Sequence, residues 1–358
     1  MSRIRAIQAL KLEKTDKVAS MEWCTGLSAE QIHALTGIDP LSRYYESMLR
    51  LIEILEIDIH GPLPFMEQLS ISCPRTNDDK CDHRQQDWGL IKGTQVQDGA
   101  RQELVFRCVD DVLRFSPLEW DVKTEEDYFE EFSTFHNRNV SLYEGRCVAE
   151  EDIYTTLFHW CIDLFGWENF MVAASTDEKR FNEILLEFKE LSIRRAKAWA
   201  RVKNLDFFMC HDDICMTSGP VFSPDWYRKY IFPHYQDIMA PLKKAGIPVI
   251  FISDGCYMSL VNDLAYCGWD GYVFDHTNDF AKMVEMFGNK KILIGGPDIR
   301  ILTFESPQNV REHVRRILEI AKGIRGYFYA TAGSLTENIP MENIKTYIQA
   351  SKQYRCAV

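Results

Sequence analysis

Long apolar runs are missing from this 358-residue sequence, and so is any excess of positive charge. No segment approaches the ~20 consecutive apolar residues that a membrane-spanning helix needs, so we expect no membrane partner. Lysine and arginine number 41 against 53 acidic residues, which gives a formal charge of −12. An acidic surface repels polyanions, and we therefore expect no nucleic-acid partner either.

A secretion signal and a disulfide pattern are missing as well. Residues 1–17 are charged throughout and contain no apolar segment of the kind that a secretory signal requires. The eleven cysteines are scattered without a repeating frame, and their number is odd. These features predict reduced thiols in a cytoplasmic protein.

What is present is an alternation of strands and helices in the second half of the chain. The expected strands are apolar throughout, and the expected helices begin at Ser-Pro pairs such as Ser223-Pro224 or end at glycines such as Gly268. The expected strands cover 205–210, 247–253, 269–276, 290–298 and 326–333. The expected helices cover 223–246, with a break at Pro233, and then 257–268, 279–288, 306–323 and 340–354.

Such uniformly apolar strands predict an α/β protein whose parallel sheet is buried on both faces. A doubly wound open sheet and a closed (β/α)8 barrel both fit the alternation. No Gly-x-Gly-x-x-Gly motif follows any strand, which argues against the dinucleotide-binding form of the open sheet. We therefore expect a (β/α)8 TIM barrel.

The first half of the chain is less regular. A first strand is expected at 17–24, and helices are expected at 29–37, 42–59, 151–166 and 178–202. Residues 61–120 form an irregular insertion in this interpretation, with a hairpin at about 87–109. Because no internal repeat or flexible linker divides the chain, we expect a single domain over 1–358 with a short N-terminal helical extension.

Polar side chains follow nearly every expected strand. In a (β/α)8 barrel the functional groups gather at the carboxyl ends of the strands, so these side chains are expected to share one anionic pocket. The strand endings are Glu22-Trp23-Cys24, His211-Asp212-Asp213, Ser253-Asp254-Gly255-Cys256, Asp275-His276, Gly296-Pro297-Asp298 and Thr331-Ala332-Gly333.

The segment from about Asp206 to Ala350 resembles the uroporphyrinogen decarboxylase superfamily. The motifs that carry the resemblance are Asp212-Asp213, Ser223-Pro224 with Pro233, Ile252-Ser253-Asp254-Gly255, Gly295-Gly296-Pro297-Asp298 and Pro340-Met341-Glu342-Asn343. The resemblance implies a (β/α)8 barrel, in agreement with the alternation of elements.

The resemblance also separates two branches of the superfamily. True decarboxylases carry an Arg-Gln-Ala-Gly-Arg stretch near the N-terminus, where this sequence has MEWCTG at 21–26. The corrinoid-dependent methyltransferases form the other branch, and their thiol-methylating members bind zinc through His-x-Cys. This sequence has Ile252 and Asp254 at those two positions. The departure favours a methyltransferase that demethylates a small methoxylated compound, aromatic or not, and loads the methyl group on a cobamide.

The cobamide is expected on a separate corrinoid-binding protein. The sequence contains no Asp-x-His-x-x-Gly motif: Asp58-Ile59-His60 begins one, but Gly61 follows at once. The expected partners are therefore that protein and a small methylated substrate, and a homodimer is compatible with the resemblance.

Demethylation of an ether needs an acid or a metal ion that assists the departing oxygen. The candidate catalytic residues are Asp213, Asp254 and His276, and a zinc site rebuilt from new ligands is predicted to use His211, Asp254, Cys256 and His276. The candidate substrate-binding residues are Glu22, Trp23, Asp212, Tyr257 and Asp298.

Structural roles compete with these assignments. Asp212 and Asp213 are also suited to capping loop amides, Asp254 to capping a helix, Asp298 to organising its turn and Cys256 to core packing. Two other functions stay open, namely methyl transfer from methylcobamide to a thiol with an altered zinc site, and ligand binding without catalysis. Tetrapyrrole decarboxylation is disfavoured, because an acidic opening repels a polycarboxylate.

Overall fold

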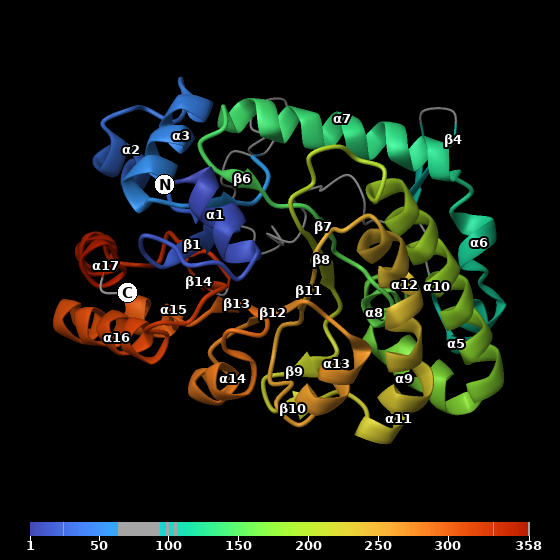
Figure 1. Cartoon of the computed structure of the whole chain (residues 1–358). Helices are drawn as coiled ribbons and strands as arrows, with labels where there is room; N and C mark the ends of the chain where they lie inside the picture. Colours follow the sequence, from blue (N-terminus) through green and yellow to red (C-terminus); the bar gives the residue numbers. More distant parts are fainter. Residues whose placement is uncertain (24, 64–93, 98–99, 104–105, 332, 357–358) are drawn as a thin grey trace.

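A single parallel sheet closes on itself at the centre of the molecule (Figure 1). The computed structural model describes residues 1–23, 25–63, 94–97, 100–103, 106–331 and 333–356. The sheet has the order β6-β3-β1-β14-β13-β12-β11-β8-β7. Its strands are β1 (Ala19–Glu22), β3 (Ile59–His60), β6 (Val148–Ala149), β7 (Asp152–Ile153), β8 (Phe208–His211), β11 (Val249–Ile252), β12 (Gly271–Phe274), β13 (Ile292–Gly295) and β14 (Tyr327–Ala330).

The two ends of this sheet belong to one stretch of chain. Strands β6 and β7 are separated only by Glu150 and Glu151, and they pair on opposite sides, β6 with β3 and β7 with β8. The ladder continues across the gap, because the Glu150 N–H donates to the His60 carbonyl at 3.0 Å and the Met209 N–H donates to the Glu151 carbonyl at 3.1 Å. Counted as one strand, β6 and β7 complete an eight-stranded parallel barrel. The predicted (β/α)8 fold is confirmed.

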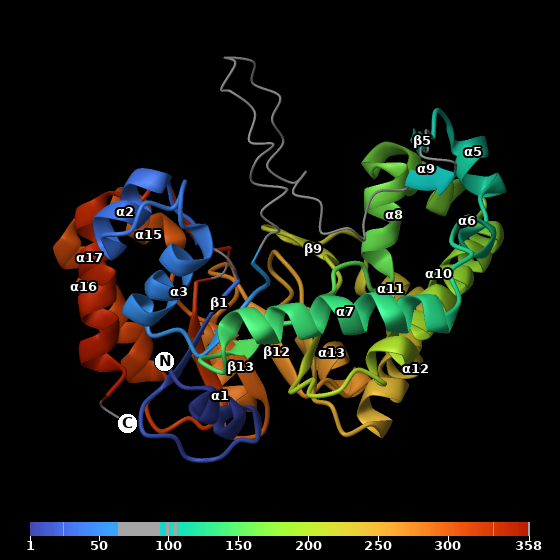
Figure 2. The ribbon, with the colours of Figure 1, turned by 90° about the horizontal axis from the view of Figure 1, so that it is seen from above.

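Helices surround the barrel, with α16 and α17 on one side and α10 and α12 on the other (Figures 1 and 2). The described helices are α1 (Arg3–Leu10), α2 (Ala29–Thr36), α3 (Tyr44–Leu55), α5 (Val109–Arg114), α6 (Pro117–Trp120), α7 (Glu125–Tyr143), α8 (Phe158–Phe165), α9 (Trp167–Thr176), α10 (Glu178–Trp199), α11 (Pro224–Tyr230), α12 (Phe232–Lys244), α13 (Val261–Cys267), α14 (Phe280–Phe287), α15 (Ile299–Phe304), α16 (Pro307–Ile320) and α17 (Met341–Tyr354). None of them is long and apolar enough to cross a bilayer.

Alternate residues of each strand point to two separate cores. Met209 and Ile250 belong to the cluster that fills the barrel, whereas Cys210 and Phe251 pack outward against the helices. Helix α1 contributes Ala6, Ala9 and Leu10 to the inner cluster, and it therefore closes the amino end of the barrel.

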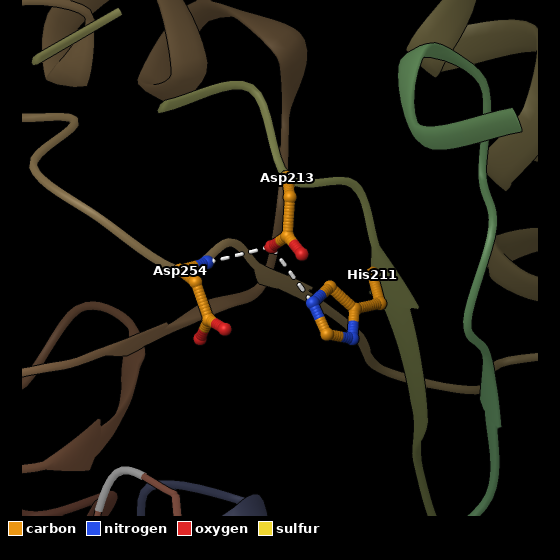
Figure 3. A group of neighbouring side chains, drawn as sticks. All are labelled: His211, Asp213 and Asp254. Carbon is orange, nitrogen blue, oxygen red and sulfur yellow. Dashed lines mark hydrogen bonds and ion pairs between the residues drawn. The ribbon is translucent and has the colours of Figure 1, made fainter. Parts of the chain in front are cut away.

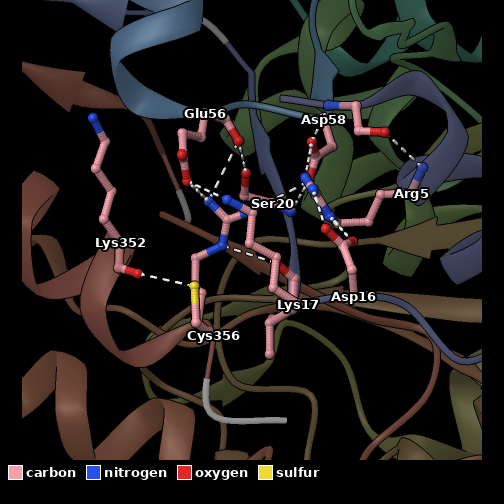
Figure 4. A network of polar contacts seen from close by, with 11 residues as sticks. Arg5, Asp16, Lys17, Ser20, Glu56, Asp58, Lys352 and Cys356 are labelled. Atoms are coloured by element: carbon pink, nitrogen blue, oxygen red, sulfur yellow. Dashed lines mark hydrogen bonds and ion pairs between the residues drawn. The ribbon is translucent and has the colours of Figure 1, made fainter.

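A network of buried charges ties this amino end together (Figure 4). The Asp58 carboxylate lies 2.8 Å from Arg5 Nη1 and 3.2 Å from Arg355 Nη2, and Arg5 Nε lies 2.6 Å from Asp16 Oδ1. Arg355 also donates to the Val18 carbonyl at 2.9 Å. We call Arg5, Asp16, Asp58 and Arg355 the amino-end network.

Two predicted helices are partly wrong. The helix expected over 42–59 ends at Leu55, and Ile59 already belongs to strand β3. The segment expected as a helix from residue 151 begins as strand β7, and helix α8 starts only at Phe158. The acidic residues Glu150, Glu151 and Asp152 concealed this third barrel strand, because they interrupt its buried apolar residues Val148, Ala149 and Ile153. The hairpin expected near 87–109 is present as β4 (Thr94–Gln97) paired with β5 (Ala100–Glu103), while residues 64–93 of the expected insertion lie outside the described residues.

Candidate functional site

Three side chains meet at the carboxyl ends of β8 and β11 (Figure 3). His211 is the last residue of β8 and lies two positions after Met209, so its ring projects toward the barrel axis. Asp213 follows in the next loop, and Asp254 lies two residues beyond the end of β11. His211 is buried, Asp213 is half-buried and Asp254 is exposed, so the group runs from the interior to solvent.

Asp213 is the centre of this group. Its Oδ1 accepts a hydrogen bond from His211 Nε2 at 2.8 Å and another from the Asp254 backbone N–H at 2.7 Å. Its Oδ2 lies 3.3 Å from Nδ1 of His159, which belongs to helix α8. His159 Nε2 in turn lies 3.1 Å from Asp163 Oδ1, one helical turn further along. Carboxylates and imidazoles therefore alternate in the order Asp163, His159, Asp213 and His211, and we call these four residues, together with Asp254, the mouth cluster.

The adjacent Asp212 holds helix α8 in place. Its fully buried carboxylate accepts backbone N–H bonds from Leu157, Phe158 and His159 at 3.2, 3.0 and 2.7 Å. The Tyr235 hydroxyl adds a fourth bond at 2.7 Å. Asp212 thus satisfies the free amides at the start of α8 and fixes His159 next to Asp213.

Gly255 explains why a glycine follows Asp254. Its φ is +81°, and a Cβ at this position would lie 2.6 Å from the Met216 carbonyl oxygen. The contact comes from the small hairpin of β9 (Cys215–Met216) and β10 (Gly219–Pro220), which follows Asp213. Only glycine combines this backbone conformation with such a close approach, so Asp254 is fixed relative to the loop that carries Asp213.

The charges of the mouth cluster set its proton affinities. Burial alone would lower the pKa of His211, but the carboxylates of Asp213 and Asp254 outweigh it and raise this pKa to about 9. Burial would raise the pKa of Asp213, but His211 and His159 hold it well below its usual range. Desolvation and the Asp213 charge raise the pKa of Asp254. At neutral pH His211 is therefore an imidazolium, and Asp213 is an ionised acceptor rather than an acid.

His159 is also protonated more readily than an ordinary histidine. Burial opposes its charge, but Asp163 and Asp213 together raise its pKa. The ring of Tyr154 packs against both histidines, with its centroid 5.3 Å from that of His159 and 4.4 Å from that of His211. Sequence reasoning missed all three of these neighbours, Tyr154, His159 and Asp163. The spacing His-x-x-x-Asp on an expected helix was the available signal.

The predicted zinc ligands do not assemble as a set. Within the described residues, only His211 and Asp254 of the four join a group whose ligand atoms lie within 4.8 Å of one another, and Asp213 is the third member. Cys256 and His276 lie outside this group. His211 Nε2 and Asp213 Oδ1 are bonded to each other, and the group that could hold a metal ion, His211, Asp213 and Asp254, shares only two residues with the predicted zinc site.

Two predicted substrate-binding residues point away from the barrel axis. Glu22 is buried between the strands and α17, where it accepts hydrogen bonds from the hydroxyls of Thr331 and Tyr347. Burial raises its pKa to about 8. Tyr257 is fully buried, and its hydroxyl donates to the Val273 carbonyl at 2.8 Å. These two residues serve packing, and Asp212 serves as the anchor of α8.

The remaining predicted residues lie at or near the mouth. Trp23 packs half-buried against the inner cluster, so its predicted contact with substrate stays a prediction. Asp298 caps α15 through the Arg300 N–H at 2.9 Å and forms an ion pair with the Arg300 guanidinium at 2.8 Å. His276 is half-buried and lies close enough to Asp298 to affect its pKa, which is lowered mainly by Arg300. A catalytic role for His276 stays a prediction.

Comparison with known proteins identifies the family. The family described as uroporphyrinogen decarboxylase (URO-D) matches residues 163–354, which is more than half of the chain. The chain therefore belongs to the uroporphyrinogen decarboxylase family, as the sequence motifs predicted.

Relatives within the family are distant. The uroporphyrinogen decarboxylase of Thermus thermophilus is 29% identical over 128 residues, which is 36% of either chain. That of Magnetococcus marinus is 23% identical over 142 residues, or 38% of this chain and 39% of the other. The matches thus span little more than a third of these relatives' length. A methyltransferase from Methanosarcina mazei shares the fold over 98% of both chains, with a TM-score of 0.61 at 16% identity.

Proposed function

We propose that this protein is a methyltransferase that takes the methyl group of a small methoxylated compound and passes it to a cobamide carried by a separate protein. The observation that carries the proposal is the position of His211 at the carboxyl end of the barrel, bonded to Asp213 and adjacent to the exposed Asp254, whose carboxylates raise the pKa of His211 to about 9. Family membership and the shared fold with a methyltransferase support it.

The chemistry follows from the leaving group. An alkoxide or phenoxide leaves carbon poorly, and protonation of the ether oxygen by a positioned acid removes this difficulty. His211 gives its proton to that oxygen as the bond to the methyl carbon breaks, and the electron pair of the bond stays on the oxygen. Asp213 holds the ring and remains ionised. A reduced cobamide, when present, supplies the nucleophile that accepts the methyl group.

This chain's own Asp-x-His sequence is unsuited to holding the cobamide. Asp58 is fully buried between Arg5 and Arg355, and His60 is fully buried with its Nδ1 2.6 Å from the Gly61 carbonyl oxygen. Burial lowers the pKa of His60 to about 4. Neither side chain is accessible to a cofactor, which supports delivery of the cobamide by a partner.

Decarboxylation of a tetrapyrrole has less support. The charged groups that act most on Asp254 are Asp213, His211, Asp275 and His159. Together with Asp254 itself, three carboxylates therefore face two imidazoles at this site. A substrate with many carboxylates would be repelled by such surroundings. A neutral ether would not be.

The test combines the purified protein, chemically reduced cobalamin and a panel of methoxylated aromatic and aliphatic compounds, with the demethylated product measured by chromatography. We expect product from at least one compound, and we expect His211→Gln to lower its rate by about 100-fold or more. His33→Gln, an exposed change on α2, should leave the rate unaltered. An absence of product from every compound, or an undiminished rate for His211→Gln, would refute the proposal. Conversion of uroporphyrinogen would favour a decarboxylase instead.

A further inference from the structure

The mouth cluster contains two residues that the proposed reaction does not use directly, His159 and Asp163. His159 is buried, with a side chain only 10% exposed, and it lies between two carboxylates, 3.1 Å from Asp163 and 3.3 Å from Asp213. A buried cation between two anions is costly to form unless both anions stay in place. We therefore ask what effect His159 and Asp163 have on the position of the Asp213 carboxylate.

A carboxylate gripped at only one oxygen is free to rotate about its χ2 bond. Asp213 is gripped at both, because Oδ1 accepts from His211 and from the Asp254 N–H while Oδ2 faces His159. The contact with His159 is oblique and has the geometry of an ion pair rather than of a straight hydrogen bond. It nevertheless opposes rotation of the carboxylate away from His211.

The backbone supports this arrangement independently. Asp212 fixes the first amides of α8, including that of His159, so the position of His159 is set by the same loop that carries Asp213. Asp163, one turn later on α8, then holds the outer nitrogen of the His159 ring. Adjacent aspartates thus divide two tasks: one fixes the helix and the other receives the histidine that the helix presents.

We infer that His159, held by Asp163, is a positioning residue that locks the Asp213 carboxylate onto His211 and so keeps the His211 ring aimed at the barrel mouth. The catalytic role of this positioning rests on the proposed function, whereas the positioning itself rests only on the observed contacts. The charged or titratable groups that face His211 are Asp152, Tyr154, His159, Asp213 and Asp254. Those that face His159 are Tyr154, Asp163, His211 and Asp213.

The direct test is the exchange of the His211 ring N–H with solvent, followed by NMR on protein labelled with ¹⁵N at histidine. In the unaltered protein we expect a slowly exchanging proton, because Nε2 is bonded to Asp213. His159→Leu should speed its exchange by about tenfold, the equivalent of one hydrogen bond. His159→Asn places an amide donor near the position of Nδ1 and should restore slow exchange at least in part.

Asp163→Ala provides a second test, since Asp163 lies at the solvent-facing end and its loss should not prevent folding. We expect it to speed the exchange in the same direction as His159→Leu but less, while Glu168→Ala, an exposed carboxylate removed from the next helix, should have no effect. Unchanged exchange in both His159→Leu and Asp163→Ala would overturn the inference. Because this readout needs no turnover, it stands apart from any failure of the demethylation assay. In that assay His159→Leu should lower kcat with little change in KM.

Discussion

The two ends of the barrel carry buried charge clusters that are built on opposite principles. At the amino end, Asp58 is bound by Arg5 and Arg355, whose guanidinium groups stay charged at every accessible pH. At the mouth, Asp213 is bound instead by His211 and His159, whose charges depend on pH. The first cluster is locked and the second is adjustable, which matches the division of (β/α)8 barrels into a stabilising and a reactive end.

The largest effect that would test this contrast is the loss of Asp58. Asp58→Asn removes the fully buried carboxylate that Arg5 and Arg355 share and leaves Arg5 paired only with the exposed Asp16, so we expect a loss of about 3–5 kcal/mol in the free energy of unfolding. Urea unfolding measures it. Asp16→Asn is the matched control, because the Asp16 side chain is 68% exposed and its loss should have a much smaller effect. Equal losses for the two variants would contradict a locked amino end.

The mouth cluster should make the free energy of unfolding depend on pH through His211. The folded pKa of His211 is about 9, above its ordinary value, so the stabilisation is complete below about pH 6.5 and is lost as the pH rises toward 9. The loss should approach about 3 kcal/mol over this interval. Urea unfolding at pH 6, 7.5 and 9.5 measures it, and His211→Gln should flatten the curve. A curve equally steep in the variant would assign the loss to other groups.

A third prediction concerns Glu22, the last residue of β1, which points outward to α17 and belongs to neither charge cluster. In the folded protein Glu22 has a pKa of about 8 and keeps its proton up to that pH. In the unfolded chain the same carboxyl group has its ordinary pKa near 4.5 and loses the proton above that pH, so folding becomes less favourable as the pH rises between the two values. Glu22→Gln should therefore stabilise the protein by about 1–2 kcal/mol at pH 8 and by little at pH 4.5. Thermal melting at the two pH values distinguishes these outcomes. Destabilisation at pH 8 would show that the carboxylate form is the one required.

The smallest expected effect is that of zinc. Because His211 and Asp213 are bonded to each other and Cys256 and His276 lie apart from them, we expect no stoichiometric zinc in the purified protein. Treatment with a chelator should leave the melting temperature unchanged. Zinc at one equivalent that disappears in His211→Gln would reverse this assignment.

Much of the barrel could be predicted from local signals. The apolar runs marked β8, β11, β12, β13 and β14, and Pro233 separated α11 from α12, which begins one residue before it. The strand at 148–153 could not be found in this way, because its acidic residues lack the apolar signature of its neighbours. Its Asp152 lies opposite Met209 inside the barrel, where burial raises its pKa to about 6.

The mouth cluster was predictable only in part. His211, Asp213 and Asp254 follow directly from the endings of two strands that pair side by side. His159 and Asp163 come from a helix about 50 residues earlier, as the separation of 53 between His159 and Asp212 records. They approach because strand β7, which precedes α8, pairs with β8, and because Asp212 binds the first amides of α8. Likewise, the neighbouring residues Asp212 and Asp213 have different roles because successive side chains point to opposite sides of the chain. Asp212 binds the amides of α8, and Asp213 binds His211.

Closure of the barrel through β1 and β14 sets a constraint on synthesis. Ala19 pairs with Phe328, and the Val18 N–H donates to the Arg355 carbonyl at 3.1 Å. The first strand therefore cannot complete its pairing until nearly the whole chain has been synthesised. Until β14 has left the ribosome, β1 is an open edge that lacks its partner on one side. For most of its translation, the nascent chain can therefore pair wrongly with other chains through this edge. We expect chaperone binding to matter most during that interval.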